Sequence, residues 1–374
     1  MFAANNVACL RTPPIASLIA YAQLMKVAVL ISGGVDSSVA LAQLAEEGAH
    51  QLTAYYLKIW LEDELAFLGS CPWEEDLRYV RDVCEKFQVP LGIVPLQREY
   101  YQSVVATAVA ELEAGRTPSP DVLCNRLIKF GAFLDRINGG VDFVASGHHA
   151  RVDHSGPLSR LLKGIDPVKD QTYFLSQMTQ RQVARCLFPI GGLTKAEVRA
   201  EARRLHLPNS DRPDSQGICF LGRVPYDAFV EHHLGENSGA IRDLTNGAEL
   251  GRHRGLWFHT IGQRRGLGLS GGPWYVVGKD PESNEVLVVH ADSLGSHHRD
   301  RFRIPSPHWI ASEPETHDLT LRIRHGERLV GCRLDPHDEG GLTVVMDEAE
   351  PGVAPGQYAV LYDGDECLGG GTIG

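Results

Sequence analysis

The chain has 374 residues, of which 43% are apolar and 22% are charged. A single hydrophobic core rarely grows beyond about 250–300 residues, so we expect two or three domains. The 36 basic and 47 acidic residues give a net charge of −11, which excludes a uniformly basic nucleic-acid-binding protein but not a local basic surface. None of the eight cysteines forms a Cys-x-x-Cys pair, and no apolar run reaches about 18 residues. This pattern favours a cytoplasmic protein without a disulfide scaffold, a structural zinc site or a membrane span.

The first 24 residues lack the pattern of a folded element. A mildly apolar stretch at residues 15–22 follows one arginine, but no clear cleavage site comes after it, which disfavours a signal or transit peptide. We therefore expect residues 1–24 to be a disordered extension and the fold to begin with a strand at Met25.

Strands and helices alternate over residues 25–208. Residues 26–31 are apolar and rich in β-branched side chains, as in a buried parallel strand, and residues 39–47 show a helical pattern that ends before Gly48. Similar patterns predict strands at 52–60, 91–96 and 141–145 and helices at 73–87, 101–114 and 130–137. This alternation is typical of an α/β fold with a doubly wound parallel sheet, which binds ligands at the carboxyl ends of its strands.

The pattern changes after residue 208. Residues 209–217 are polar and contain proline, and we expect a central linker module over 209–273. From residue 274 onward short strands alternate with turns, and residues 280–284 are typical of a hairpin turn. Residues 274–374 therefore predict a small C-terminal β-barrel.

The strongest chemical signal is the sequence Ser-Gly-Gly-Val-Asp-Ser-Ser at residues 32–38. It lies between a predicted strand and a helix, where backbone N–H groups and the helix N-terminus can cradle a phosphate. The lysine of a kinase-type P-loop is missing. The motif resembles the PP-loop of ATP pyrophosphatases, in which Asp36 would assist Mg²⁺ or orient the phosphates. Residues 146–147 end another strand and form a second predicted edge of this site.

Two cysteines lie in polar surroundings. Cys124 follows two prolines and Asp121, and Cys219 lies in a polar stretch bounded by glycines. A cysteine is more often a small buried apolar residue, but these settings predict exposed, reactive thiols.

Together with the PP-loop, these motifs resemble the tRNA-specific 2-thiouridylases over residues 25–374. The motifs that carry the resemblance are residues 32–38, 117–125, 145–148, 169–174, 214–222, 262–268 and 367–371. Several motifs in a fixed order are far more specific than a single motif.

The resemblance implies ATP-dependent 2-thiolation of the wobble uridine of tRNA. ATP adenylates the C2 oxygen, which otherwise is a poor leaving group, and the bound AMP then departs. Cys219 would carry a persulfide received from a donor protein, either a cysteine desulfurase or a relay protein. Cys124 would be the second, nucleophilic thiol and close a transient disulfide with Cys219, and Asp121 would act as a general acid/base or orient the reacting groups.

The resemblance also implies which residues bind each substrate. ATP contacts fall on Leu30, Ile31, Ser32, Gly33, Gly34, Val35, Asp36, Ser37, Leu57 and Gly147. The target base and tRNA contacts fall on Ser119, Pro120, Asp121, Lys169, Asp170, Gln171, Arg324 and His325. Mg²⁺ would accompany ATP, with no metal held by protein ligands alone.

Some positions depart from the family pattern, and basic residues cluster in two stretches. Ser119 replaces the usual Asn, Gln216 replaces Thr, and His325 replaces a Tyr expected to stack on tRNA. Residues 181–204 and 252–265 are rich in arginine and lysine, which predicts either tRNA phosphate contacts or merely a solvated face.

Three other functions compete with this interpretation. An amide-forming synthetase with the same PP-loop would need neither thiol and would survive their alkylation. A non-catalytic RNA-binding protein would release no pyrophosphate from ATP. An iron–sulfur thiolation enzyme is disfavoured by the lack of Cys-x-x-Cys pairs.

Overall fold

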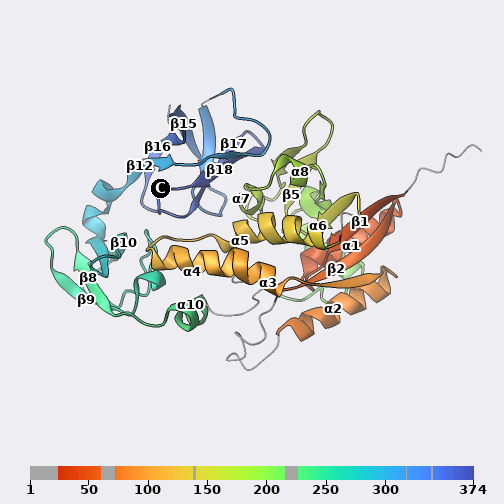
Figure 1. Ribbon diagram of the computed structural model, residues 1–374, viewed down its shortest axis with the longest axis horizontal. Helices are drawn as coiled ribbons and strands as arrows, with labels where there is room; N and C mark the ends of the chain where they lie inside the picture. The colour runs from red at the N-terminus through yellow and green to blue at the C-terminus, as the bar shows by residue number, and fades with distance from the viewer. Residues whose placement is uncertain (1–23, 60–71, 138–139, 215–225, 317, 338–339) are drawn as a thin grey trace, which may run out of the picture.

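A computed structural model describes residues 24–374 except 60–71, 138–139, 215–225, 317 and 338–339 (Figure 1). The prediction that residues 1–24 are disordered therefore lies outside the described residues, apart from Leu24. Within the described part of the chain, none of the helices has both the length and the apolar character that a membrane crossing requires.

The first sheet confirms the expected parallel α/β architecture. Its order is β3-β2-β1-β4-β7 and every neighbouring pair is parallel. The strands are β1 (Met25–Leu30), β2 (His50–Lys58), β3 (Leu91–Pro95), β4 (Phe143–Ser146) and β7 (Cys186–Leu187). The chain moves outward from β1 to β3 and then returns to the other side of β1, so the strand order reverses between β1 and β4. The carboxyl ends at such a reversal are where open α/β sheets bind ligands.

Alternate residues of β1 enter different core clusters, so both faces of the sheet are covered. Val27 and Val29 pack with α1 (Val35–Glu47) and α2 (Pro72–Lys86), whereas Ala28 packs with the helices that follow β3. This is the result expected of a strand with a side-chain period of two.

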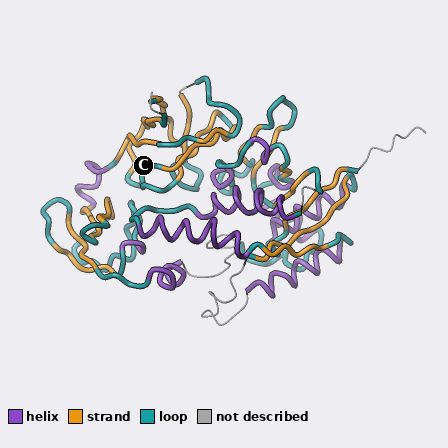
Figure 2. The backbone as a smooth tube through the Cα atoms, in the orientation of Figure 1, coloured by secondary structure: helices purple, strands orange, loops and turns teal. Residues whose placement is uncertain are grey.

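Two interrupted helices lie side by side on the second face (Figure 2). One consists of α3 (Gln97–Tyr100), the π-helical η3 (Tyr101–Val105) and α4 (Ala106–Glu113); the other consists of α5 (Pro120–Leu123), the π-helical η4 (Cys124–Ala132) and α6 (Phe133–Arg136). The expected helix at 130–137 thus begins about ten residues earlier. Pro120 occupies the first helical turn, where a missing N–H costs nothing.

The remaining helices are short. They are α7 (Thr172–Leu175), α8 (Gln180–Val183), η5 (Pro189–Gly192), α9 (Lys195–Arg204), α10 (Tyr226–Leu234), η6 (Leu256–Phe258) and η7 (Ala291–His297). Of these, α9 packs on α1 beside the parallel sheet, and its start has a Thr194–Glu197 capping box.

A separate four-stranded sheet lies at the far end of the molecule from β1 (Figure 1). It has the order β10-β11-β8-β9 and contains β8 (Gly239–Asp243), β9 (Glu249–His253), β10 (Trp274–Asp280) and β11 (Glu285–His290). The predicted hairpin at 274–290 is present, but β11 pairs with β8. The expectation that this hairpin starts the C-terminal strand series is wrong, because β11 pairs with β8 and the hairpin therefore belongs to the four-stranded sheet.

The C-terminal strands form a nine-stranded antiparallel sheet with two strands from much earlier in the chain. Its members are β5 (Ala150–Asp153), β6 (Arg160–Lys163), β12 (Arg299–Ile304), β13 (His308–Trp309), β14 (Asp318–Arg322), β15 (Val330–Pro336), β16 (Leu342–Glu350), β17 (Tyr358–Asp363) and β18 (Glu366–Thr372). Val360 and Tyr362 share one hydrophobic core with Tyr173 and Leu175 of α7. The C-terminal sheet is therefore packed directly onto the parallel domain.

Candidate functional site

The PP-loop connects β1 to α1 in a tight turn. Gly33 has φ +81°, and a Cβ there would lie 2.7 Å from the carbonyl oxygen of Asp76. The hydroxyls of Ser32 and Ser37 lie 3.3 Å apart across the turn. Among the described residues, no side chain caps the start of α1 at Gly34, which leaves the helix N-terminus suited to an anion.

The end of β4 lies against this helix start. A Cβ at Gly147 would be only 2.5 Å from the backbone nitrogen of Ser37, so no larger residue fits without displacing the loop. His148 follows, buried, with Nδ1 2.8 Å from the Ser146 hydroxyl, and burial lowers its pKa so that the ring is neutral. The two predicted edges of the site thus meet where the strand order reverses.

Asp36 is held ionised in the PP-loop. Its Oδ1 lies 2.6 Å from Lys195 Nζ and 3.7 Å from His149 Nε2. Burial alone would raise the pKa of Asp36, but the nearby His149 ring and the hydrogen bond and charge of Lys195 outweigh it, so the pKa is lowered.

A second carboxylate, Asp214, joins three cations beside the loop. Its oxygens lie 2.8 Å from Lys195 Nζ, 2.8 Å from Lys169 Nζ and 2.6 Å from Arg199 Nη2. Burial raises the pKa of Asp214, but the two lysines lower it further than burial raises it. Together with Asp36, this cluster has three positive charges and two negative charges, which suits a site for a polyphosphate.

The segment before Asp214 also wraps the PP-loop. Asn209 Nδ2 donates to the Gly33 carbonyl at 2.8 Å and to the Ser38 hydroxyl at 2.9 Å, and Arg212 Nη1 donates to the same carbonyl at 3.0 Å. These contacts fix the loop from the side on which the chain leaves the parallel domain.

Cys124 is not the exposed thiol that its sequence setting predicts. It opens η4, its exposed fraction is 0%, and it packs in one core cluster with Leu30 and Leu57, near the carboxyl ends of β1 and β2. The prolines that suggested a loop instead lead into α5, which turns the next residues inward. Ser119, the N-cap residue of α5, and Asp121 in its first turn precede the thiol.

Four of the expected ATP contacts have buried side chains. Leu30, Ile31, Val35 and Leu57 are at most 6% exposed and belong to the core clusters. At these positions only the backbone is available to a nucleotide.

Comparison with known proteins covers nearly the whole chain. Residues 25–223 match the family described as the tRNA methyl transferase HUP domain, residues 227–290 the tRNA methyl transferase PRC-barrel domain, and residues 299–373 the aminomethyltransferase β-barrel domain. A protein of Bacteroides thetaiotaomicron described as tRNA-specific 2-thiouridylase MnmA 1 is 43% identical, over 93% of this chain and 99% of the relative. The chain belongs to the tRNA-specific 2-thiouridylase family.

Two further members show the same level of similarity. The MnmA 2 of Bacteroides fragilis is 43% identical over 94% of this chain and its whole length. The MnmA of Porphyromonas gingivalis is 41% identical over 93% of this chain and 99% of its own length. As in this family, the chain consists of a HUP domain, a PRC-barrel-like middle domain and a C-terminal β-barrel domain.

The expected persulfide carrier of this family lies outside the described residues. Cys219 falls in the gap at 215–225, so its pairing with Cys124 stays a prediction. The described chain stops at Asp214, five residues before Cys219, where the carboxylate is bound at the PP-loop.

The three expected tRNA contacts at 169–171 have partners within the protein. Lys169 pairs with Asp214, while Asp170 is buried in an ion pair with Arg322 of β14. The Gln171 side chain accepts a hydrogen bond from the backbone of His149 at 2.9 Å. Asp170 is closed to a ligand, whereas Lys169, whose side chain is 40% exposed, and the partly buried Gln171 are not.

His325 lies beside α7, and Arg324 precedes it just beyond the end of β14. β14 ends at Arg322, which is buried, whereas Arg324 beyond the strand is exposed. His325 stacks on Phe174 with ring centres 4.6 Å apart.

The two basic stretches differ from a plain RNA-binding surface. In the first, Lys195 and Arg199 face the PP-loop, and Arg204 pairs with Glu46. In the second, Arg254 pairs with acidic residues of α10, whereas Arg264 and Arg265 are exposed.

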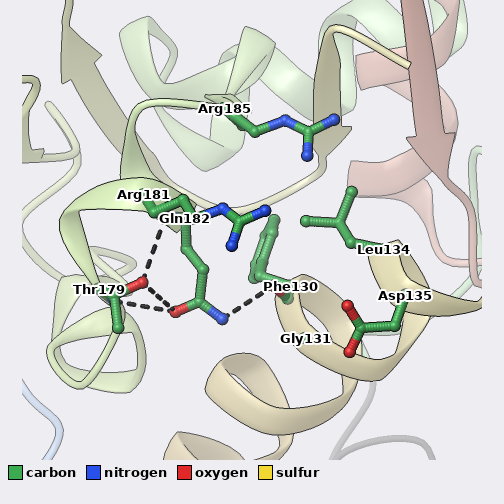
Figure 3. Close-up of a pocket in the computed structure, with 8 residues that line it drawn as sticks. All are labelled: Phe130, Gly131, Leu134, Asp135, Thr179, Arg181, Gln182 and Arg185. Atoms are coloured by element: carbon green, nitrogen blue, oxygen red, sulfur yellow. Dashed lines mark hydrogen bonds between the residues drawn. The ribbon is translucent and has the colours of Figure 1, made fainter. Parts of the chain in front are cut away.

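Two arginines of the first stretch line a surface pocket between η4, α6 and α8 (Figure 3). Arg181 and Arg185 extend over it, Gln182 ties α8 to the Phe130 carbonyl at 2.8 Å, and Asp135 lies on the opposite wall.

Sequence reasoning missed three residues that hold the PP-loop: Asn209, Arg212 and Lys195 acting on Asp36. The only signal for the first two was the polar stretch after the parallel domain. The sequence pattern places Lys195 in a basic stretch, because nothing in its local sequence shows that α9 begins beside the PP-loop.

Proposed function

We propose that the protein is a tRNA-uridine 2-sulfurtransferase that uses ATP to replace the C2 oxygen of the wobble uridine with sulfur. The observation that carries this proposal is the PP-loop with its Lys195–Asp36–Asp214 cluster, five residues upstream of Cys219 in the chain. Family membership supports the tRNA substrate, since its relatives are described as tRNA-specific 2-thiouridylases.

The first step is adenylation of the base. The C2 oxygen attacks the α-phosphorus of ATP and pyrophosphate leaves, so the oxygen now departs as AMP. Lys195 and Lys169 are the cations that offset the charge developing on the phosphates. The ionised Asp36 would hold Mg²⁺ together with phosphate oxygens and water, a ligand set that this ion accepts, and the ion would supply further neutralisation.

The second step transfers sulfur. The terminal sulfur of a Cys219 persulfide attacks C2, or is first released as sulfide, and AMP leaves. Cys124 attacks the sulfur of Cys219 and breaks its bond to the transferred sulfur, which stays on C2 or, in the alternative, leaves as the sulfide that attacks C2. This closes the Cys124–Cys219 disulfide, and an external thiol reductant must then reopen it. Asp121 is positioned one helical turn before Cys124 to move a proton at the base or thiol.

Burial of Cys124 has a consequence for this step. A disulfide requires the two Cα atoms to approach within about 7 Å. Because Cys124 is fully buried, we infer that the turn before it opens when the base or the persulfide enters.

The partners are tRNA and a persulfide donor, either a cysteine desulfurase or a relay protein. Exposed Arg264, Arg265 and Arg324 would contact tRNA phosphates on an otherwise acidic protein. The five cysteines that the structure describes are free thiols, which supports a cytoplasmic location.

The test is mass spectrometry of wobble uridine after incubation with ATP, Mg²⁺, tRNA and a persulfide donor. A mass increase for replacement of oxygen by sulfur, dependent on ATP, is expected. Pyrophosphate release without 2-thiouridine, and unaffected by alkylation of the thiols, would instead favour an amide-forming PP-loop enzyme.

A further inference from the structure

The turn that leads to Cys124, residues 117–125, is held by residues from outside the parallel sheet. The backbone N–H of Thr117 donates to the carbonyl oxygen of Pro355 in the β-barrel domain at 2.9 Å. The barrel therefore fixes the point at which this segment, the Cys124 turn, begins.

A buried tyrosine hydroxyl connects the barrel to α7, the helix that packs against α5 of the turn. Tyr173 of α7 is 3% exposed, and its hydroxyl donates to the carbonyl oxygen of Tyr358 in β17 at 3.1 Å.

The end of the turn is also tied to α7. Asn125, 2% exposed, donates from Nδ2 to the carbonyl oxygen of Phe174 at 3.1 Å. On its outer side Phe174 is stacked by His325 of the barrel, with an interplanar angle of 25°. The residue after Cys124 thus takes its position from a helix that the barrel covers.

A buried ion pair fixes the start of α7 to the same domain. Arg322 of β14 pairs with Asp170, and both side chains are at most 2% exposed. The Thr172 hydroxyl, in the first turn of α7, donates to Asp170 at 2.8 Å and lies 3.2 Å from the Tyr362 hydroxyl. A buried charge pair of this kind is costly to break, so α7 has little freedom to move relative to the barrel.

We propose that the β-barrel domain is a positioning element of the sulfur-transfer site: through Tyr173 and α7 it holds Asn125 and so orients the Cys124 turn. This inference rests on the proposed 2-thiolation, because the orientation of Cys124 matters only if its thiol reacts. In this proposal the segment 169–174 contributes to sulfur transfer mainly through its contacts inside the protein, which hold the Cys124 turn. A misplacement of about 1 Å at a reacting group can cost roughly 100-fold in rate, so one lost anchor has a measurable effect.

The test removes the hydroxyl that ties α7 to the barrel. In Tyr173→Phe, we expect the single-turnover rate of 2-thiouridine formation, at saturating tRNA and with preloaded persulfide, to fall by about fivefold or more. Hydrogen exchange of residues 117–125 should become faster, while the tRNA Kd and the Tm stay within error. In an Asn125→Ala background, which lacks the bond to the Phe174 carbonyl, Tyr173→Phe should add little. The matched control is Tyr101→Phe, which removes the hydroxyl of a partly buried tyrosine packed on the same core.

Each outcome decides a different point. A Tyr173→Phe rate and exchange equal to those of Tyr101→Phe, beside an active wild type, overturn the positioning role alone. A rate loss matched by a lower Tm and a reduced folded fraction also overturns it, in favour of a purely structural role. A wild-type protein that forms no 2-thiouridine overturns the proposed function. The positioning role proposed for the barrel then falls as well, because it depends on that function.

Discussion

Lys195 is the residue at which the basic helix α9 meets the nucleotide site. Its ammonium lies between Asp36 and Asp214 and is only 14% exposed. In Lys195→Met, we expect pyrophosphate release to fall by about 100-fold or more, because a preorganised charge on the phosphates is lost. The tRNA Kd, measured by filter binding, should stay unchanged.

The control for this prediction is Arg204→Met on the same helix. Arg204 pairs with Glu46 at the surface, with both side chains about half exposed, and such pairs contribute little. Equal losses of pyrophosphate release in both variants would show that the Lys195 effect comes from the helix and not from the phosphates.

The proposed mechanism gives the two thiols, Cys124 and Cys219, separable roles. Cys219→Ser should lose persulfide loading but still release pyrophosphate, whereas Cys124→Ser should load the persulfide and fail to complete sulfur transfer. Mass spectrometry of the protein and of the tRNA measures the two steps. Cys84→Ala is the control, because burial raises the pKa of the Cys84 thiol to about 11 and keeps it unreactive. Normal 2-thiouridine formation by Cys219→Ser would contradict the persulfide role.

At the scale of an element, the loop 262–268 between β9 and β10 presents Arg264 and Arg265 to solvent. Charge reversal of both should weaken the binding of every tRNA substrate and flatten the slope of log K against log salt by about 1 per lost phosphate contact. Arg264→Glu alone should have a smaller effect of the same kind. Its control is Arg252→Glu, because Arg252 already pairs with Glu249 and is expected to make no phosphate contact. An unchanged salt slope would place the RNA on another surface.

The strand β10 contains a partly buried lysine with a distinct pH signature. Its burial lowers the pKa of Lys279 from 10.5 to about 8 in the folded state. Between these values the unfolded chain binds more protons, so folding stability rises with pH. The Tm of the wild type relative to Lys279→Met should therefore increase from about pH 8 to 10.5. Calorimetry measures this difference, and a flat difference for Lys279→Met would contradict the effect of burial.

At the scale of the whole molecule, the Asp170–Arg322 pair joins the HUP and β-barrel domains. Arg322→Met leaves a buried carboxylate without its charge partner and should destabilise the protein by about 3–5 kcal/mol. Asp170→Asn combined with Arg322→Met should be less destabilising than Arg322→Met alone, because no unpaired charge remains. Thermal unfolding of the full chain measures both, and simple addition of the two single effects would contradict coupling.

Local sequence was sufficient for the elements of the parallel domain. The strand at β1, the helix closed by Gly48 in a left-handed conformation, and the PP-loop between them were all predictable. Their signals are hydrophobic period, glycine at a helix end and glycine at a phosphate turn, which depend on residues adjacent in the chain. The same is true of the hairpin at 274–290, whose turn is local.

Only the tertiary structure decided which segments meet. β5 and β6 joined the C-terminal sheet and β11 paired with β8, because strand pairing depends on the edges available after folding. Cys124 became buried because α5 turned its polar approach into a helix packed on the sheet. Charges followed the same rule: the partners of Lys195 and Arg322 lie 159 and 152 residues away, beyond the reach of any local pattern.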